Sequence, residues 1–155
     1  MVHATADGRP AAPRVIRVGR VEPDPIAPTF DDLLGLEILD SSDDQVRARV
    51  PVRDAVKQPM GLVHGGLHAA VAESLATAAT QAALGDEDAT AVGLATSTAF
   101  LRPITAGAVH AHARRLHRGR TTWVWNVELT DDAGRLCATV RMTVAVRRAI
   151  GPDPP

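Results

Sequence analysis

The sequence is poor in several features that particular classes of protein require. Cys137 is the only cysteine among 155 residues, so an intrachain disulfide is impossible and a disulfide-held secreted scaffold is excluded. The formal net charge is −1 and the basic residues are scattered, which argues against a nucleic-acid surface. Neither a signal-peptide-like apolar segment nor a run of about 18 apolar residues is present. We therefore expect a cytoplasmic protein without a membrane span.

The composition that remains is that of one globular domain. Hydrophobic residues make up 45% of the chain and charged residues 23%, close to ordinary globular usage. Residues 1–28 mix Pro, Arg, Ala and Gly without a period, which predicts an extended or mobile N-terminal segment. Residues 149–155 are similar and predict a mobile tail. Residues 29–148 are then the folded domain.

The periodicity of apolar residues predicts two strands, one long helix and four further strands. Thr29 and the acidic residues after it are typical of the start of a short helix, and residues 36–38 and 46–52 alternate like a hairpin around the polar turn at 40–44. Residues 66–84 are rich in Ala and predict the long helix, with Glu73, Thr77 and Thr80 on its polar side. Residues 90–101, 108–117, 121–130 and 136–147 predict a four-stranded meander.

The last two of these strands each have one apolar face, and the long helix is the only sizeable element that could cover it. A single antiparallel sheet wrapped around one central helix is an α+β architecture known as the hotdog fold. The many alanines suit it, because a curved sheet must approach such a helix closely.

The segment from Gln58 to Ala78 reads QPMGLVHGGLHAAVAESLATA, with a His-Gly-Gly loop at the start of the helix. Together with FLRP at 100–103, TTWVW at 121–125 and DDAGRLCA at 131–138, it resembles hotdog acyl-CoA thioesterases of the phenylacetic-acid-pathway type. It is most similar to the 4-hydroxybenzoyl-CoA thioesterases that use a helix glutamate. The resemblance covers residues 35–148.

This resemblance implies a set of roles. Glu73 would be the nucleophile or general base, and Thr77 would support it. The Gly65 backbone N–H and the Gln58 side chain would polarise the thioester carbonyl, and His64 would order the loop. Candidate contacts to the CoA nucleotide are Arg102, Arg120, Thr121, Thr122 and Arg148. CoA is then part of the substrate, and no separate cofactor is expected.

Elementary chemistry supports the same residues independently. The N-terminus of a helix offers free N–H groups and partial positive charge to an oxygen that becomes negative during attack. However, Gly65 and Glu73 would lie about 12 Å apart along one helix. We therefore expect each site to combine the two residues from different subunits of a homodimer, with a dimer of dimers as the larger assembly.

Several alternatives remain open at this stage. Small neighbours, Ala69, Ala70, Ala72 and Ala76, are predicted to exclude water from Glu73, which would act either as a nucleophile or as a general base. Competing functions are a hotdog enoyl-CoA hydratase or dehydratase and a non-catalytic acyl-CoA sensor. His64 and His68 have a spacing that can ligate metal, but no third ligand follows, so no metal is expected. Aryl groups are the first choice for the acyl part.

Overall fold

The computed structural model describes residues 28–85 and 89–148. The predicted N-terminal segment, apart from residue 28, and the predicted tail lie outside these ranges. No helix in the described ranges is both long and apolar enough to cross a membrane.

The elements follow the predicted order. They are α1 (Phe30–Leu34), β1 (Glu37–Ser41), β2 (Gln45–Pro51), the 3-10 helix η1 (Asp54–Val56), α2 (Gly65–Leu84), β3 (Ala89–Phe100), β4 (Ala108–Arg118), β5 (Thr122–Thr130) and β6 (Leu136–Arg148). The long helix and the four strands after it begin and end within one residue of their predicted bounds. The alternation of apolar and polar residues in β5 and the high alanine content of α2 are therefore sufficient to predict these elements from the sequence.

The six strands form one antiparallel sheet in the order β1-β2-β4-β5-β6-β3. The predicted four-stranded meander is wrong in one respect, because β3 pairs with β6 at the sheet edge and β4 pairs with β2. Only β4, β5 and β6 form a meander. Consecutive strands usually pair when a tight turn joins them, whereas residues 101–107 carry the chain from the edge strand back to the middle of the sheet.

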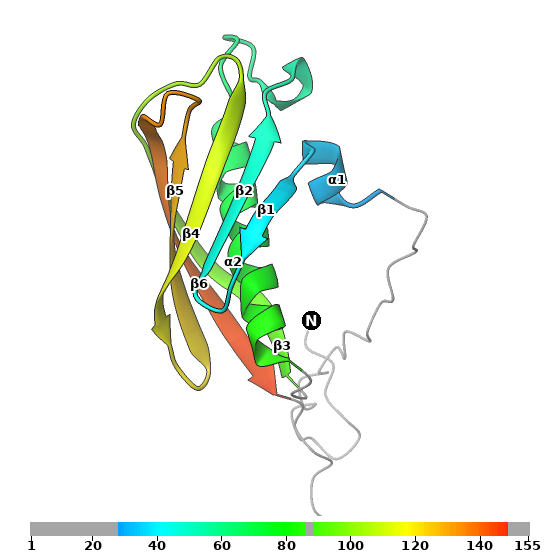
Figure 1. Ribbon diagram of the computed structural model, residues 1–155, viewed down its shortest axis with the longest axis vertical. Helices are drawn as coiled ribbons and strands as arrows, with labels where there is room; N and C mark the ends of the chain where they lie inside the picture. Colours follow the sequence, from blue (N-terminus) through cyan, green and yellow to red (C-terminus); the bar gives the residue numbers. More distant parts are fainter. Residues whose placement is uncertain (1–27, 86–88, 149–155) are drawn as a thin grey trace, which may run out of the picture.

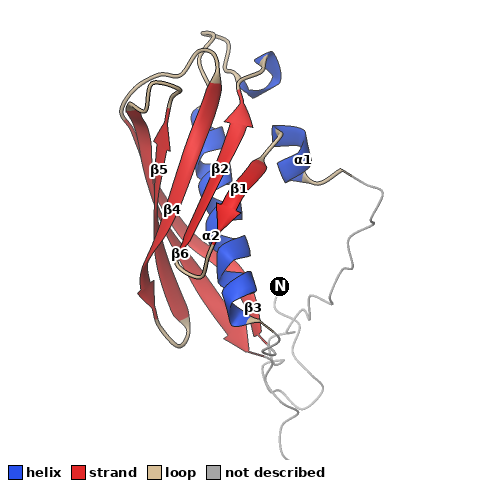
Figure 2. Ribbon diagram, in the orientation of Figure 1, coloured by secondary structure: helices blue, strands red, loops and turns tan. Residues whose placement is uncertain are grey.

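The helix α2 lies across one face of this strongly curved sheet, as Figures 1 and 2 show. The expected sheet wrapped around a central helix is thereby confirmed. Its core contains the inward-facing residues predicted for β5 and β6, including Trp123, Trp125, Val140 and Val144. Cys137 is also fully buried, and burial raises the pKa of its thiol, as expected for an inert structural cysteine.

Two details of burial differ from the sequence prediction. Thr80 does not belong to an exposed polar stripe: it is fully buried, accepts a hydrogen bond from Trp125 Nε1 at 3.0 Å and donates one to the Ala76 carbonyl at 2.7 Å. β1 is exposed at every position rather than half-buried, because it is the outermost strand on its side of the sheet.

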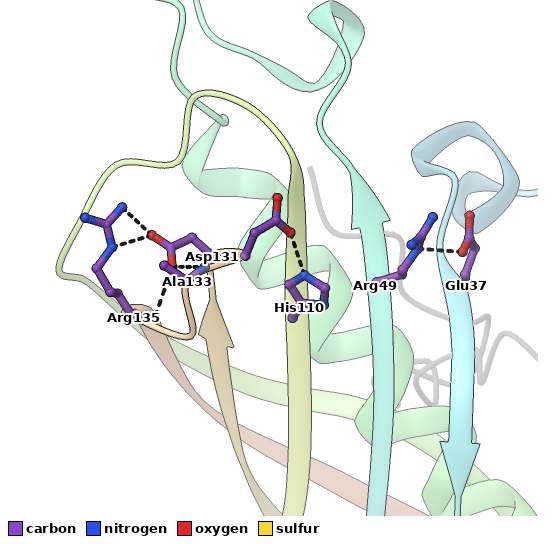
Figure 3. Close-up of polar contacts among 7 residues, drawn as sticks. Glu37, Arg49, His110, Asp131, Ala133 and Arg135 are labelled. Carbon is purple, nitrogen blue, oxygen red and sulfur yellow. Dashed lines mark hydrogen bonds and ion pairs between the residues drawn. The ribbon is translucent and has the colours of Figure 1, made fainter.

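Polar side chains stabilise the turn between β5 and β6, as Figure 3 shows. In the turn between β5 and β6, Asp131 accepts hydrogen bonds from the backbone N–H groups of Ala133 and Arg135 and from the Arg135 guanidinium at 2.7 Å. These donors lower the pKa of Asp131. His110 on β4 lies 2.8 Å from an oxygen of Asp132 in the same turn. The predicted turn at 131–134 is thus confirmed, with its aspartate as the organising residue.

Candidate active site

The start of α2 is shaped by the His64-Gly65-Gly66 loop. His64 is the N-cap residue, and its Nδ1 accepts a hydrogen bond from the Gly66 N–H at 2.9 Å. A Cβ at position 66 would lie 3.0 Å from that nitrogen, so glycine leaves room for the histidine ring. The Gly65 N–H has no acceptor within the described part of the chain. It remains available to a ligand oxygen at the positive end of the helix dipole.

A cavity of about 430 Å³ opens beside this helix end. Its walls include Gln58, Gly65, His68, Phe100, Arg102 and Ile104. The structure therefore brings together the two residues predicted to polarise a carbonyl, Gln58 and Gly65. Arg102, predicted to contact the nucleotide, lies at the same cavity.

The glycine at position 65 has a packing role that was not expected. A Cβ there would come within 2.9 Å of the Phe100 ring. The space that a side chain would fill is thus taken by an aromatic ring from the end of β3, rather than left open to a ligand. The approach to the Gly65 N–H is bounded by this ring.

His68 is the buried polar residue of the cavity wall. It is 4% exposed, its ring lies 6.0 Å from that of Phe100, and Nδ1 has no hydrogen-bond partner among the described residues. Burial lowers the pKa of His68, because it disfavours the charged form of the ring. Since His64 is used as a helix cap, the two histidines do not act as a pair. No cluster of three metal-ligating side chains occurs in the described ranges.

Glu73 lies in the middle of α2 and is exposed in the single chain. Thr77, one turn further, donates a hydrogen bond to Glu73 Oε1 at 3.4 Å. The expectation that alanines enclose the carboxylate is wrong for the single chain, because Ala72 and Ala76 face the hydrophobic core instead. The side chain nevertheless does not extend freely into solvent: Oε1 would lie only 2.9 Å from a Cβ at Gly93 on β3.

Within one chain, the carboxylate and the helix start are separate. Both Gly65 and Glu73 belong to the uninterrupted α2, so about 12 Å of helix rise separates them. One carbonyl carbon cannot contact both ends of this distance. A complete site of this type requires a second α2.

The candidate nucleotide contacts also divide into two groups. The backbone N–H of Arg102 donates a hydrogen bond to the Cys137 carbonyl, near the start of β6. The backbone carbonyl of Thr121 accepts a hydrogen bond from the Val146 N–H, near the end of the same strand. Nine residues of strand correspond to about 30 Å. Arg120 and Thr121 are exposed and Thr122 is half-buried at that far end. Only the backbone of Arg148 is described, at the end of β6.

Sequence reasoning missed two residues of this region. Gly93 lies against Glu73, and Phe100 covers the side of Gly65. A signal for Gly93 was present, since an isolated glycine inside a strand indicates a bulge or a close approach. The position of Phe100 depends on the pairing of β3 with β6, which no local pattern specifies.

Comparisons with known proteins agree on one family. The model of the thioesterase superfamily matches residues 60–138. Thioesterase PA1618 of Pseudomonas aeruginosa is 38% identical over 118 residues, which cover 76% of this chain and 81% of that protein. A crystal structure of a PA1618 variant superposes with a TM-score of 0.73 at 36% identity and covers 76% of this chain and 85% of that one.

Two further relatives extend the comparison. The proofreading thioesterase EntH of Cronobacter turicensis is 36% identical over 118 residues, covering 76% of this chain and 85% of that protein. A crystal structure of a variant of SAV0944 from Staphylococcus aureus has a TM-score of 0.76 at 28% identity, covering 78% of this chain and all of that one.

Proposed function

The chain belongs to the thioesterase superfamily, and from this premise we propose that it hydrolyses an acyl-CoA thioester to a free acid and CoA, with Glu73 as the catalytic carboxylate. The thioester carbonyl would bind the Gly65 N–H and the Gln58 amide of one subunit. Glu73 of the partner subunit would act on the carbonyl carbon. Thioester hydrolysis is the activity of the family; the residue roles and the acyl group are the proposal.

The main support for the proposal is that the Gly65 N–H has no acceptor in the described ranges. This donor begins a 20-residue helix and opens on a cavity that also contains Gln58. A carbonyl oxygen there would gain negative charge as the tetrahedral intermediate forms. Fixed N–H donors stabilise that charge, and each is worth about 10²–10³ in kcat in well-studied hydrolases.

Two crystallised variants of a related protein support the choice of Gln58 and Glu73. Structures of SAV0944 include one with alanine in place of a glutamate and one with alanine in place of a glutamine, and those two positions are 15 residues apart. Gln58 and Glu73 have the same separation in this chain. The residues altered in that protein thus have the chemistry and the spacing of the pair proposed here.

The proposed assembly is a homodimer that pairs two copies of α2 and β3. β3 is an edge strand, bonded only to β6 within the described ranges, and it exposes Val92, Leu94 and Phe100. An unpaired edge with exposed apolar side chains favours addition of a second strand. A dimer of dimers in the cytoplasm is the complete form that we propose.

Two mechanisms fit this arrangement. Glu73 could attack the carbonyl carbon and expel the CoA thiolate, giving a mixed anhydride that water then hydrolyses. Alternatively, Glu73 could remove a proton from water as the water attacks, and the proton would return to the leaving thiolate. The first-choice substrates are aryl-CoA thioesters, since the cavity beside Gly65 is bounded by Phe100, His68 and Ile104.

The test is a thiol-release assay with a panel of aryl-CoA and alkyl-CoA thioesters. Glu73→Gln should lower kcat by about 10²–10⁴-fold, the usual contribution of a positioned base. Glu37→Gln changes an exposed surface carboxylate paired with Arg49 and is the matched control, which should retain activity. Binding of a non-hydrolysable CoA thioether should persist in both variants. Near-normal turnover by Glu73→Gln would reject both mechanisms.

A further inference from the structure

The end of the Glu73 side chain lies close to Gly93 on the strand β3. A Cβ built on Gly93 would lie 2.9 Å from Glu73 Oε1 and 3.4 Å from Glu73 Cγ. Distances under 3.0 Å to a carboxylate oxygen are repulsive, so a side chain at position 93 and the observed position of Glu73 exclude each other. The carboxylate occupies the space that Gly93 leaves empty.

The same oxygen has a second constraint. Thr77, on the next turn of α2, donates its hydroxyl hydrogen bond to Oε1 at 3.4 Å. Oε1 is therefore the carboxylate oxygen that faces both the Thr77 hydroxyl and the space left by the missing side chain of Gly93. We propose that Gly93 is a positioning residue, whose lack of a side chain directs the Glu73 carboxylate. This inference rests on the proposed function of Glu73.

Gly93 lies at an irregularity of β3, but its backbone conformation does not require a glycine. The register of β3 against β6 shifts between Gly93 and Ala95, so Leu94 is an extra residue in the strand. Such a bulge changes the direction in which neighbouring side chains point. Gly93 itself does not have a positive φ. An alanine would therefore fit the backbone conformation, and its methyl group would displace the side chains that it contacts.

Those side chains can move without unfolding the protein. The two close groups are the end of Glu73 and the terminal methyl of Met142, which would lie 3.0 Å from the added Cβ. Both are ends of flexible side chains, so Gly93→Ala should change the melting temperature little. The displaced carboxylate, however, would lose its alignment, and a misplacement of about 1 Å can cost about 10²-fold in rate.

The experiment measures kcat and KM of Gly93→Ala with a CoA thioester that the wild type hydrolyses. We expect kcat to fall about 10-fold to 100-fold with KM changed less than about 3-fold. Ala95→Gly, the reverse exchange two residues along the same strand, controls for strand flexibility and should retain kcat. An unchanged kcat in Gly93→Ala would overturn the inference.

A second comparison separates positioning from a general effect on the fold. In the Glu73→Ala background, adding Gly93→Ala should not reduce the residual rate further, because the group that it displaces is already gone. An equal further loss in the double variant would show that Gly93 acts by another route and would also overturn the inference. High activity of Glu73→Ala alone would instead contradict the proposed function.

Discussion

His68 combines almost complete burial with an ionisable ring. Its pKa is lowered by burial, so the unfolded chain binds a proton at this position more readily than the folded chain. Between the folded pKa and the unfolded value of about 6.5, the unfolded state carries more protons, and stability falls as the pH is lowered. His68 therefore makes the folded protein sensitive to mild acid.

Replacement of this ring should reduce that sensitivity. We expect the free energy of unfolding of the wild type to fall between pH 7.5 and pH 5, and to fall less in His68→Leu, because leucine cannot take up a proton. Urea unfolding at the two pH values measures both changes. His112→Gln is a second comparison, since burial lowers the pKa of that histidine too, with smaller contributions from the positive charges of Arg47 and Arg114. Equal pH dependence of wild type and His68→Leu would contradict the prediction.

At the scale of elements, Thr80 joins the helix to the sheet. Its hydroxyl accepts a hydrogen bond from the Trp125 indole N–H on β5, and both residues are fully buried. Thr80→Val keeps the shape but leaves the indole donor without a partner. We expect a loss of about 1–3 kcal/mol in unfolding free energy, the usual penalty for an unsatisfied buried donor.

Thr80→Ser provides the control, because it keeps the hydroxyl and loses one methyl group. Chemical denaturation followed by tryptophan fluorescence should rank the serine variant above the valine variant in stability. A valine variant as stable as the wild type would show that the hydrogen bond contributes nothing net.

The elements themselves could largely be predicted from local patterns. Alternation in residues 122–130 and the alanine-rich segment around Glu73 specify a strand and a helix before any tertiary contact is known. The position of β3 could not be predicted in this way, because its partner β6 is separated from it in the chain by β4 and β5. The burial of Thr80 could not be predicted for a similar reason, since its hydrogen-bond partner Trp125 lies 45 residues away in the sequence.

The start of α2 could be predicted from the sequence more completely than the surroundings of Glu73. The His64 cap and the Gln58–Gly65 pair follow from a contiguous motif, and the structure places them together. The surroundings of Glu73 follow from contacts between α2 and β3. Periodicity identifies which helix face carries the carboxylate, but not that a glycine lies beneath it.

At the scale of the whole molecule, the separation of Gly65 and Glu73 gives a test of shared sites. If each site takes Gln58 from one subunit and Glu73 from the other, a mixed dimer of Gln58→Ala and Glu73→Ala chains contains one intact site and one doubly altered site. Such a dimer should recover about half of the wild-type kcat, although each parent variant is nearly inactive.

The measurement uses two affinity tags on co-expressed chains, sequential purification and the thiol-release assay, with the assembly size determined by light scattering. Dimers built from two differently tagged Glu73→Ala chains are the control and should stay inactive. Inactive mixed dimers would show that both residues act within one subunit.

The strand order also has a consequence during synthesis on the ribosome. β3 is synthesised before β4 and β5, and its partner β6 is the last strand of the described ranges to emerge. Until then, both edges of a 12-residue strand lack a partner within the nascent polypeptide. Long unpaired strands are prone to join neighbouring chains. Translation through β6 therefore supplies the partner for one edge of β3, and the other edge, unpaired within the described ranges, stays open to the β3 of a second subunit.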